Sequence, residues 1–238
     1  MKSRMRTAWA LRFSCWLLAW VVWCPVQAHR LQDSVPAHLC PGLNLQVLAA
    51  HPADFQDACS GAQAALNFFT AHGFQVGQQL LIEVVDKLPE AAGPAAVACY
   101  LIEHQRILIL SYEVFGKRQS WFEIPVSREL YRSLASHEVA HALAASNFAG
   151  LRPALQAQEY VAYAVMFATM NPDLRTRILQ ALPGTGFDHE IQITAIFYAL
   201  DPLVFGVEAY RHFIKEDNGI AFLRLVFTGK ALTDGNSR

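Results

Sequence analysis

The stretch Leu134-Ala-Ser-His-Glu-Val-Ala-His-Ala-Leu143 decides how this chain folds, because it places two histidines four positions apart in an apolar segment. Side chains four residues apart on a helix lie on one face, one turn above each other. His137 and His141 could then reach the same metal ion, with Glu138 close enough to act on a water molecule. The alternative is a buried helix whose two histidines are hydrogen-bonded and hold no metal.

Start and stop signals frame this segment as one helix of about 20 residues, from Ser127 to about Phe148. Ser127 is a suitable N-cap, and the acidic Glu129 follows in the first turn. Gly150 is placed to end the helix in a left-handed conformation. The two histidines are therefore expected in the second half of a well-delimited helix.

A catalytic zinc takes three protein ligands and keeps a fourth position open for water, so a third ligand is needed. Residues 153–170 form the next helical segment, and a short connection favours antiparallel packing of the two helices. Glu159 then arrives level with His141, since each lies about 9 Å from the connection. An isolated carboxylate in an apolar helix needs a positive partner, which a metal ion would supply. The alternative is a surface-facing glutamate on an amphipathic helix.

The motif and its spacing resemble those of the gluzincin metallopeptidases, a branch of the zincins, over residues 127–166. HEVAH is followed after seventeen residues by Glu159, within Gln158-Glu-Tyr-Val-Ala-Tyr163. The nearest likeness is to the aminopeptidase branch, whose glutamate follows after eighteen residues in a helix that reads roughly N-E-G-F-A-x-Y. The Gly-containing exopeptidase signature of that branch is absent upstream of HEVAH. The chain also resembles an uncharacterised family of secreted bacterial proteins, which supplies no substrate.

This resemblance implies a ligand set for one Zn²⁺ ion, formed by His137, His141 and Glu159. It also implies that Glu138 is the general base, which takes a proton from the zinc-bound water and returns it to the leaving amine.

A gluzincin also has a tyrosine or histidine that stabilises the tetrahedral oxyanion. The candidates in this chain are Tyr210, His212 and Tyr163. Tyr210 or His212 is preferred, because such a donor usually comes from a later helix. The alternative is that these residues are ordinary surface or core aromatics.

Three hypotheses about function follow. The leading one is a zinc metallopeptidase that hydrolyses the peptide bonds of a peptide or protein substrate. The second is a catalytically inactive zincin-like domain that binds a metal or a protein. The third is a structural domain without metal, in which Glu159 points away from both histidines.

The N-terminus has the features of a secretory signal peptide. Lys2, Arg4 and Arg6 precede an apolar run at residues 13–23, and Val26-Gln-Ala28 offers a cleavage site after Ala28. The apolar run is short for a membrane span, which needs roughly 20 residues. We therefore expect a secreted or periplasmic protein with no stable membrane insertion after cleavage. The alternative is an uncleaved N-terminal anchor.

Loss of residues 1–28 would remove four of the 19 basic residues and none of the 20 acidic ones, which leaves a net charge of −5. Such a balance gives no reason to expect a nucleic acid partner or an anionic membrane surface. The remaining cysteines are Cys40, Cys59 and Cys99. In an oxidising compartment we expect one disulfide, with Cys40–Cys59 as the local choice.

The periodicity predicts an α+β fold, with a small mixed or antiparallel sheet before the HEVAH helix and a mostly helical C-terminal half, and the gluzincin resemblance implies that this fold is zincin-like. Residues 29–238 are expected to form a single zincin-like domain, divided into a sheet part (29–126) and a helical part with the metal site (127–238). In gluzincins an edge strand of this sheet binds the peptide backbone. Residues 97–103 and 106–112 are expected to form a hairpin, whose second strand is expected near the cleft. The expected strands are 43–48, 79–86, 97–103 and 106–112, and the remaining expected helices are 52–72, 173–182, 190–199, 202–215 and 218–228.

Overall fold

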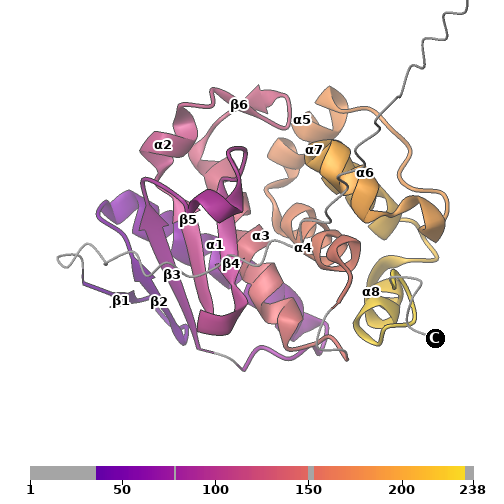
Figure 1. Ribbon diagram of the computed structural model, residues 1–238, viewed down its shortest axis with the longest axis horizontal. Helices are drawn as coiled ribbons and strands as arrows, with labels where there is room; N and C mark the ends of the chain where they lie inside the picture. The colour runs from indigo at the N-terminus through magenta and orange to yellow at the C-terminus, as the bar shows by residue number, and fades with distance from the viewer. Residues whose placement is uncertain (1–35, 78, 150–152, 234–238) are drawn as a thin grey trace, which may run out of the picture.

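A five-stranded mixed sheet forms the N-terminal part of the fold, and the C-terminal part is helical, as Figure 1 shows. The structure is a computed structural model that describes residues 36–77, 79–149 and 153–233. The strand order is β1-β2-β3-β5-β4, with β2, β3 and β5 parallel and the two outer strands antiparallel to their neighbours. The α+β class and the mixed sheet are confirmed. The strands are β1 (His38–Leu39), β2 (Leu45–Leu48), β3 (Leu80–Val85), β4 (Ala98–Leu101) and β5 (Arg106–Leu110).

Helix α1 (Pro52–Ala71) connects the parallel strands β2 and β3, because parallel neighbours need a crossover connection. The disulfide Cys40–Cys59 ties the chain before β2 to this helix, with the two Cα atoms 5.5 Å apart. This is the pairing expected from the sequence. The predicted signal peptide at residues 1–28 lies outside the described residues.

The strand at the edge of the sheet next to β5 is β4. The second strand of the expected hairpin, which we expected near the cleft, is β5 and lies inside the sheet. β5 lies between β3 and β4, with Ile82 and Tyr100 both paired to Ile107. Its run Ile107–Leu110 is apolar and buried throughout, which is typical of an interior strand covered on both faces. The backbone of β4, at one of the two edges of the sheet, is therefore free to pair with a further strand.

Helix α3 (Arg128–Ala145) carries the HEVAH motif and begins where the sequence predicts. The hydroxyl of Ser127 accepts a hydrogen bond from the Leu130 backbone N–H at 3.2 Å. The helix ends at Ala145, three residues before the expected Phe148. The side-chain amide of Asn147 donates to the Leu143 carbonyl at 2.8 Å and so occupies one of the last carbonyl acceptors of the helix. The expected stop at Gly150 lies outside the described residues.

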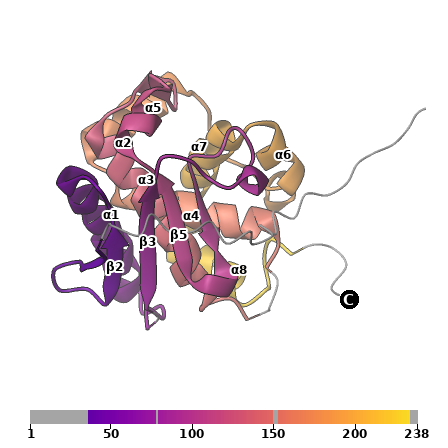
Figure 2. The ribbon, with the colours of Figure 1, turned by 60° about the vertical axis from the view of Figure 1, so that its left-hand side comes forward.

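Helix α3 packs between α1 and α4 (Leu155–Thr169) and is buried along most of its length. Its N-terminal half is fixed to α1 by ion pairs. Arg128 contacts Asp54 at 2.5 Å and Asp57 at 2.9 Å, and Arg132 contacts Asp57 at 2.6 Å. Both aspartates are almost fully buried, so these arginines supply the positive charge that buried carboxylates need. Helix α3 also contacts β4 and β5, and Figure 2 shows it next to the sheet.

The C-terminal helices α5 to α8 follow the sequence prediction with one break. Residues 190–199, expected as one helix, form a short 3₁₀ segment and α6, because Thr194 caps a new helix by accepting from the Phe197 N–H at 3.1 Å. None of the helices in the described ranges is long and apolar enough to cross a membrane. The elements are α5 (Pro172–Ala181), η3 (Glu190–Gln192), α6 (Ala195–Leu200), α7 (Pro202–Phe213) and α8 (Gly219–Phe227).

One helix and one hairpin between β5 and α3 were not expected from the sequence. They are α2 (Tyr112–Gly116) and the pair β6 (Ser120–Trp121) and β7 (Ile124–Pro125). The turn of this hairpin places Phe122 in the core beside α4.

The contact between α1 and α3 depends on Gly61. A Cβ atom at this position would lie 2.7 Å from the Cβ of Ala135 and 2.9 Å from the Ser136 nitrogen. We predict that Gly61→Ala lowers the free energy of unfolding by about 1–3 kcal/mol in urea titrations, although alanine favours helix formation. Gly116→Ala in α2 is the control, since nothing lies within 4 Å of its Cβ position. Equal stability of both variants would contradict the prediction.

Candidate metal centre

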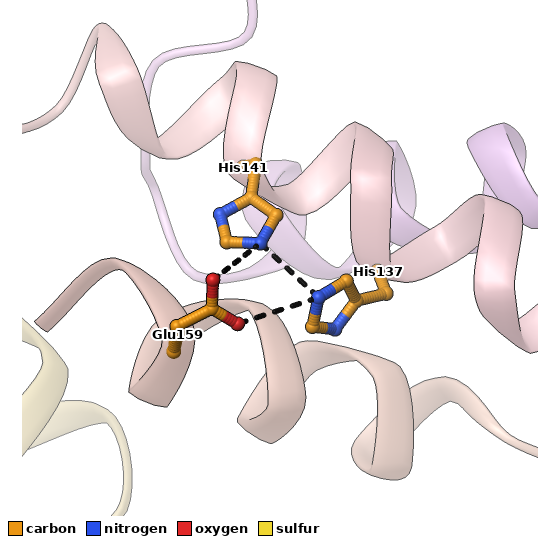
Figure 3. Close-up of side chains that lie close together, drawn as sticks. All are labelled: His137, His141 and Glu159. Atoms are coloured by element: carbon orange, nitrogen blue, oxygen red, sulfur yellow. Dashed lines mark hydrogen bonds and ion pairs between the residues drawn. The ribbon is translucent and has the colours of Figure 1, made fainter. Parts of the chain in front are cut away.

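Three side chains from α3 and α4 converge on one point, as Figure 3 shows. The Nε2 atoms of His137 and His141 lie 3.1 Å apart. One carboxylate oxygen of Glu159 lies 3.7 Å from the first of these atoms, and the other lies 3.6 Å from the second. The antiparallel packing of α3 and α4 therefore brings Glu159 level with His141, as the sequence predicts.

These separations fit a tetrahedral zinc site. Two ligand atoms that each lie about 2.05 Å from a tetrahedral ion are about 3.3 Å from each other. The separation of the two Nε2 atoms, 3.1 Å, and the shortest separation of each from a Glu159 oxygen, 3.6 and 3.7 Å to different oxygens, lie around this value. Two imidazoles and one carboxylate are also a donor set that catalytic zinc sites use, with a fourth position left for water.

Unpaired polar atoms at this point also favour a cation. One carboxylate oxygen of Glu159 is buried and has no hydrogen-bond partner among the described residues. Its side chain is 10% exposed, and those of His137 and His141 are 9% and 14% exposed. A buried carboxylate without a partner is costly, and a divalent cation would satisfy it together with both imidazoles.

The site as it stands is uncharged, because burial disfavours every ionised form. Burial, together with the smaller effect of a charge on Glu159, raises the pKa of Glu138 to about 8. Burial also raises the pKa of Glu159 to about 8, against the effect of a hydrogen bond from Tyr198. It lowers the pKa of His141 to about 4 and that of His137 well below its ordinary value, where His141 adds to the effect. Neutral imidazoles are the form that binds metal.

Two tyrosines complete the surroundings of the ligands. The ring of Tyr163 lies 4.5 Å from the His137 ring, measured between centroids. Tyr198, on α6, has its hydroxyl within hydrogen-bonding reach of the Glu159 carboxylate. Burial raises the pKa of both phenols, and the charge of Glu159 raises it further. Both therefore remain O–H donors at neutral pH.

Tyr210 and His212, the oxyanion donors that we preferred from the sequence, have their contacts elsewhere. The ring of Tyr210 stacks on Phe167, with the centroids 5.3 Å apart. His212 is buried, and its Nδ1 lies 2.7 Å from the Tyr160 hydroxyl. These contacts place both side chains in the packing between α4 and α7. Of the three candidates, only Tyr163 contacts a metal ligand.

Tyr198 was missed by the sequence reasoning, although its segment was expected to be helical. It lies 39 positions after Glu159, on a helix of six residues. No local spacing links it to the HEVAH motif. The only available signal was a tyrosine in a short apolar segment between the Thr194 cap and Asp201-Pro202, which is weak evidence of a role in a site.

Comparison with known proteins gives a family but no function. A family model described as "Family of unknown function (DUF6639)" matches residues 45–236, which include the three candidate ligands, Glu138, Tyr163 and Tyr198. No curated protein and no solved structure matches the chain. Functional inference therefore depends on the geometry of the site.

The metal-free protein is predicted to lose stability as the pH rises from about 6.5 to about 8. In this range Glu138 and Glu159 are protonated in the folded chain and ionised in the unfolded chain, so the folded state binds more protons. The histidines oppose this decrease only weakly, because their folded pKa values are lowered and unfolded histidine is already half neutral at about pH 6.5. Urea unfolding of chelator-treated protein should show a decrease of roughly 1–2 kcal/mol per carboxylate.

Glu159→Gln is the matched variant for this measurement, because it keeps the shape of the side chain and removes its titration. It should lose about half of the pH dependence. A constant or rising stability of the metal-free wild type between these two pH values would contradict the assignment of the two buried carboxyl groups.

Proposed function

The chain belongs to the DUF6639 family, whose function is unknown, and from the site alone we propose that it is a zinc-dependent metallopeptidase. The observation that carries this proposal is the convergence of His137, His141 and Glu159 within 4.8 Å of one another. We assign these three residues as the ligands of one Zn²⁺ ion. The chemistry that zinc supplies when bound is polarisation of a carbonyl group and a lower pKa for water, towards about 7.

Glu138 is the general base of the proposed reaction. It follows the first ligand on α3 and is 6% exposed, and the effect of Glu159 on its pKa supports a position near the proposed metal centre. A carboxylate in this position takes the proton of the attacking water and delivers it to the leaving amine of the peptide. The raised pKa of about 8 belongs to the metal-free site, and a cation bound beside Glu138 would favour the ionised form that acts as a base.

Tyr198 is the donor that we assign to the substrate oxyanion. Its hydroxyl lies beside the carboxylate of a metal ligand, and its raised pKa keeps the proton in place at neutral pH. A fixed O–H donor beside the reacting carbonyl stabilises the charge that develops on the oxygen. It replaces Tyr210 and His212 in this role.

The substrate class follows from the gluzincin resemblance and from the sheet. In that clan an edge strand binds the peptide backbone, and β4 is the edge strand of this sheet that packs against α3, whereas β1 forms the opposite edge. The order of elements, with the sheet followed by the HEVAH helix and the Glu159 helix, supports a zincin-type fold. The signal-like N-terminus and the Cys40–Cys59 disulfide support a secreted or periplasmic location.

The decisive experiment compares zinc content and hydrolysis in the wild type and in Glu138→Gln. The wild type, purified without chelators, should hold one zinc per chain and cleave a degenerate library of quenched fluorescent peptides. Glu138→Gln should keep the zinc and lose activity by about 10²–10⁴-fold, because only the proton transfer is removed.

His141→Ala is the control that removes a ligand, and it should lose both zinc and activity. A wild type that holds no zinc would refute the proposed metal site and, with it, the proposed function. Zinc-loaded wild type that cleaves no peptide would leave the second hypothesis, a zincin-like domain that binds metal without turnover.

Tyr198→Phe tests the oxyanion assignment separately. The variant keeps the ring and loses only the hydroxyl, so it should bind zinc as the wild type does and show a kcat lower by about 10²–10³-fold. Tyr210→Phe is the control and should retain the wild-type kcat. A kcat of Tyr198→Phe within twofold of the wild type would refute the assignment.

A further inference from the structure

His137 lacks the hydrogen bond that normally orients a metal-binding imidazole. Such a ligand usually donates its second ring N–H to a carboxylate, a carbonyl or water, which fixes the plane of the ring. In this chain the Nδ1 atom of His137 is buried and has no partner among the described residues. Another contact must therefore hold the ring.

Within the described part of the chain, the His137 ring has two ring contacts. One is the other ligand, His141, at 4.7 Å between centroids, and the second is Tyr163 at 4.5 Å. Tyr163 is 5% exposed and is confined from a further side, because a Cβ on Gly206 would lie 2.5 Å from its ring. Its ring is thus wedged between α3 and α7.

The ring of Phe122 also packs against Tyr163. The Phe122 ring meets the Tyr163 ring edge-on at 6.2 Å and the Phe167 ring at 5.4 Å, and it is fully buried. It projects from the turn between β6 and β7, where Phe122 has φ +53° and Glu123 has φ +59°. Turns of this kind usually use glycine, asparagine or aspartate, because left-handed conformations are unfavourable for larger side chains.

A strained turn persists when the surrounding structure favours it, and such turns cluster at functional sites. In this turn the unfavourable backbone conformation directs Phe122 into the packing behind Tyr163. The contacts run from Phe122 through Tyr163 to His137, and they join the hairpin to a metal ligand whose Nδ1 atom has no hydrogen-bond partner in the described chain.

We infer that Phe122 and Tyr163 are positioning residues that orient the His137 imidazole towards the metal by aromatic packing, in place of a hydrogen bond. The inference rests on the proposed metal site and concerns its affinity. It assigns to the β6–β7 hairpin a function in metal binding, although the hairpin contributes no ligand.

The test measures the zinc Kd by competition with a chromophoric chelator, together with the visible d–d spectrum of the Co²⁺-substituted protein. Phe122→Ala should raise the Kd by about 10- to 100-fold and change the Co²⁺ spectrum, because the His137 ring is no longer fixed. Phe122→Leu should restore most of the affinity by refilling the space.

Phe69→Ala is the matched control. Phe69 is also fully buried, and its ring contacts are with Phe68, Phe74 and Phe227 rather than with the hairpin or Tyr163. This variant should lose stability in the same way and keep the wild-type Kd and spectrum. A Kd of Phe122→Ala within twofold of that of Phe69→Ala would overturn the inference.

A second pair of variants keeps the test decisive if Phe122→Ala does not fold. Tyr163→Phe retains the ring and should bind zinc as the wild type does, whereas Tyr163→Leu should weaken binding at least tenfold. Equal affinity of these two variants would refute the inference and leave the metal site standing. A wild type that binds no zinc would instead refute the proposed function itself.

Discussion

The buried carboxylate of Glu159, which faces two neutral imidazoles, is the constraint on which the rest of this structure depends. An ionised carboxylate in such surroundings costs several kcal/mol unless a positive charge meets it. No described arginine or lysine pairs with it, so the metal-free site has to keep the carboxyl group protonated. A divalent cation removes this penalty and satisfies both imidazoles at once, which makes metal binding and folding stability thermodynamically linked.

Such a site needs helices that hold ligand atoms to within a few tenths of an ångström. Helix α3 meets this need because it is enclosed on two sides, by α1 and by α4. The close approach at Gly61 and the ion pairs of Asp54 and Asp57 with Arg128 fix its position relative to α1. None of these residues lies in the metal centre. They determine its geometry through the packing of the helix that carries both histidines.

Parts of the structure that follow from local spacing could be predicted from the sequence. The two histidines share a helix face, and a short connection between antiparallel helices brings Glu159 to them, so the ligand set was available from spacing alone. Parts that follow from tertiary packing could not be predicted from the sequence. Tyr198 reaches the site through the placement of a six-residue helix, and Phe122 occupies a turn whose sequence lacks the glycine or asparagine that usually marks such a conformation.

The site therefore combines elements of different local stability. Its ligands come from α3 and α4, whose residues are mostly buried, whereas Tyr198 comes from α6, which has no fully buried residue and leaves Ile196 and Leu200 73% and 82% exposed. Local stability increases with buried contacts, so α6 is expected to open more readily than the two ligand helices. The hydroxyl of Tyr198 interacts with the Glu159 carboxylate, and a cation bound by this carboxylate would compete for the same oxygens. Occupation of the metal site then directly affects the hydroxyl of Tyr198, which is the donor that α6 supplies.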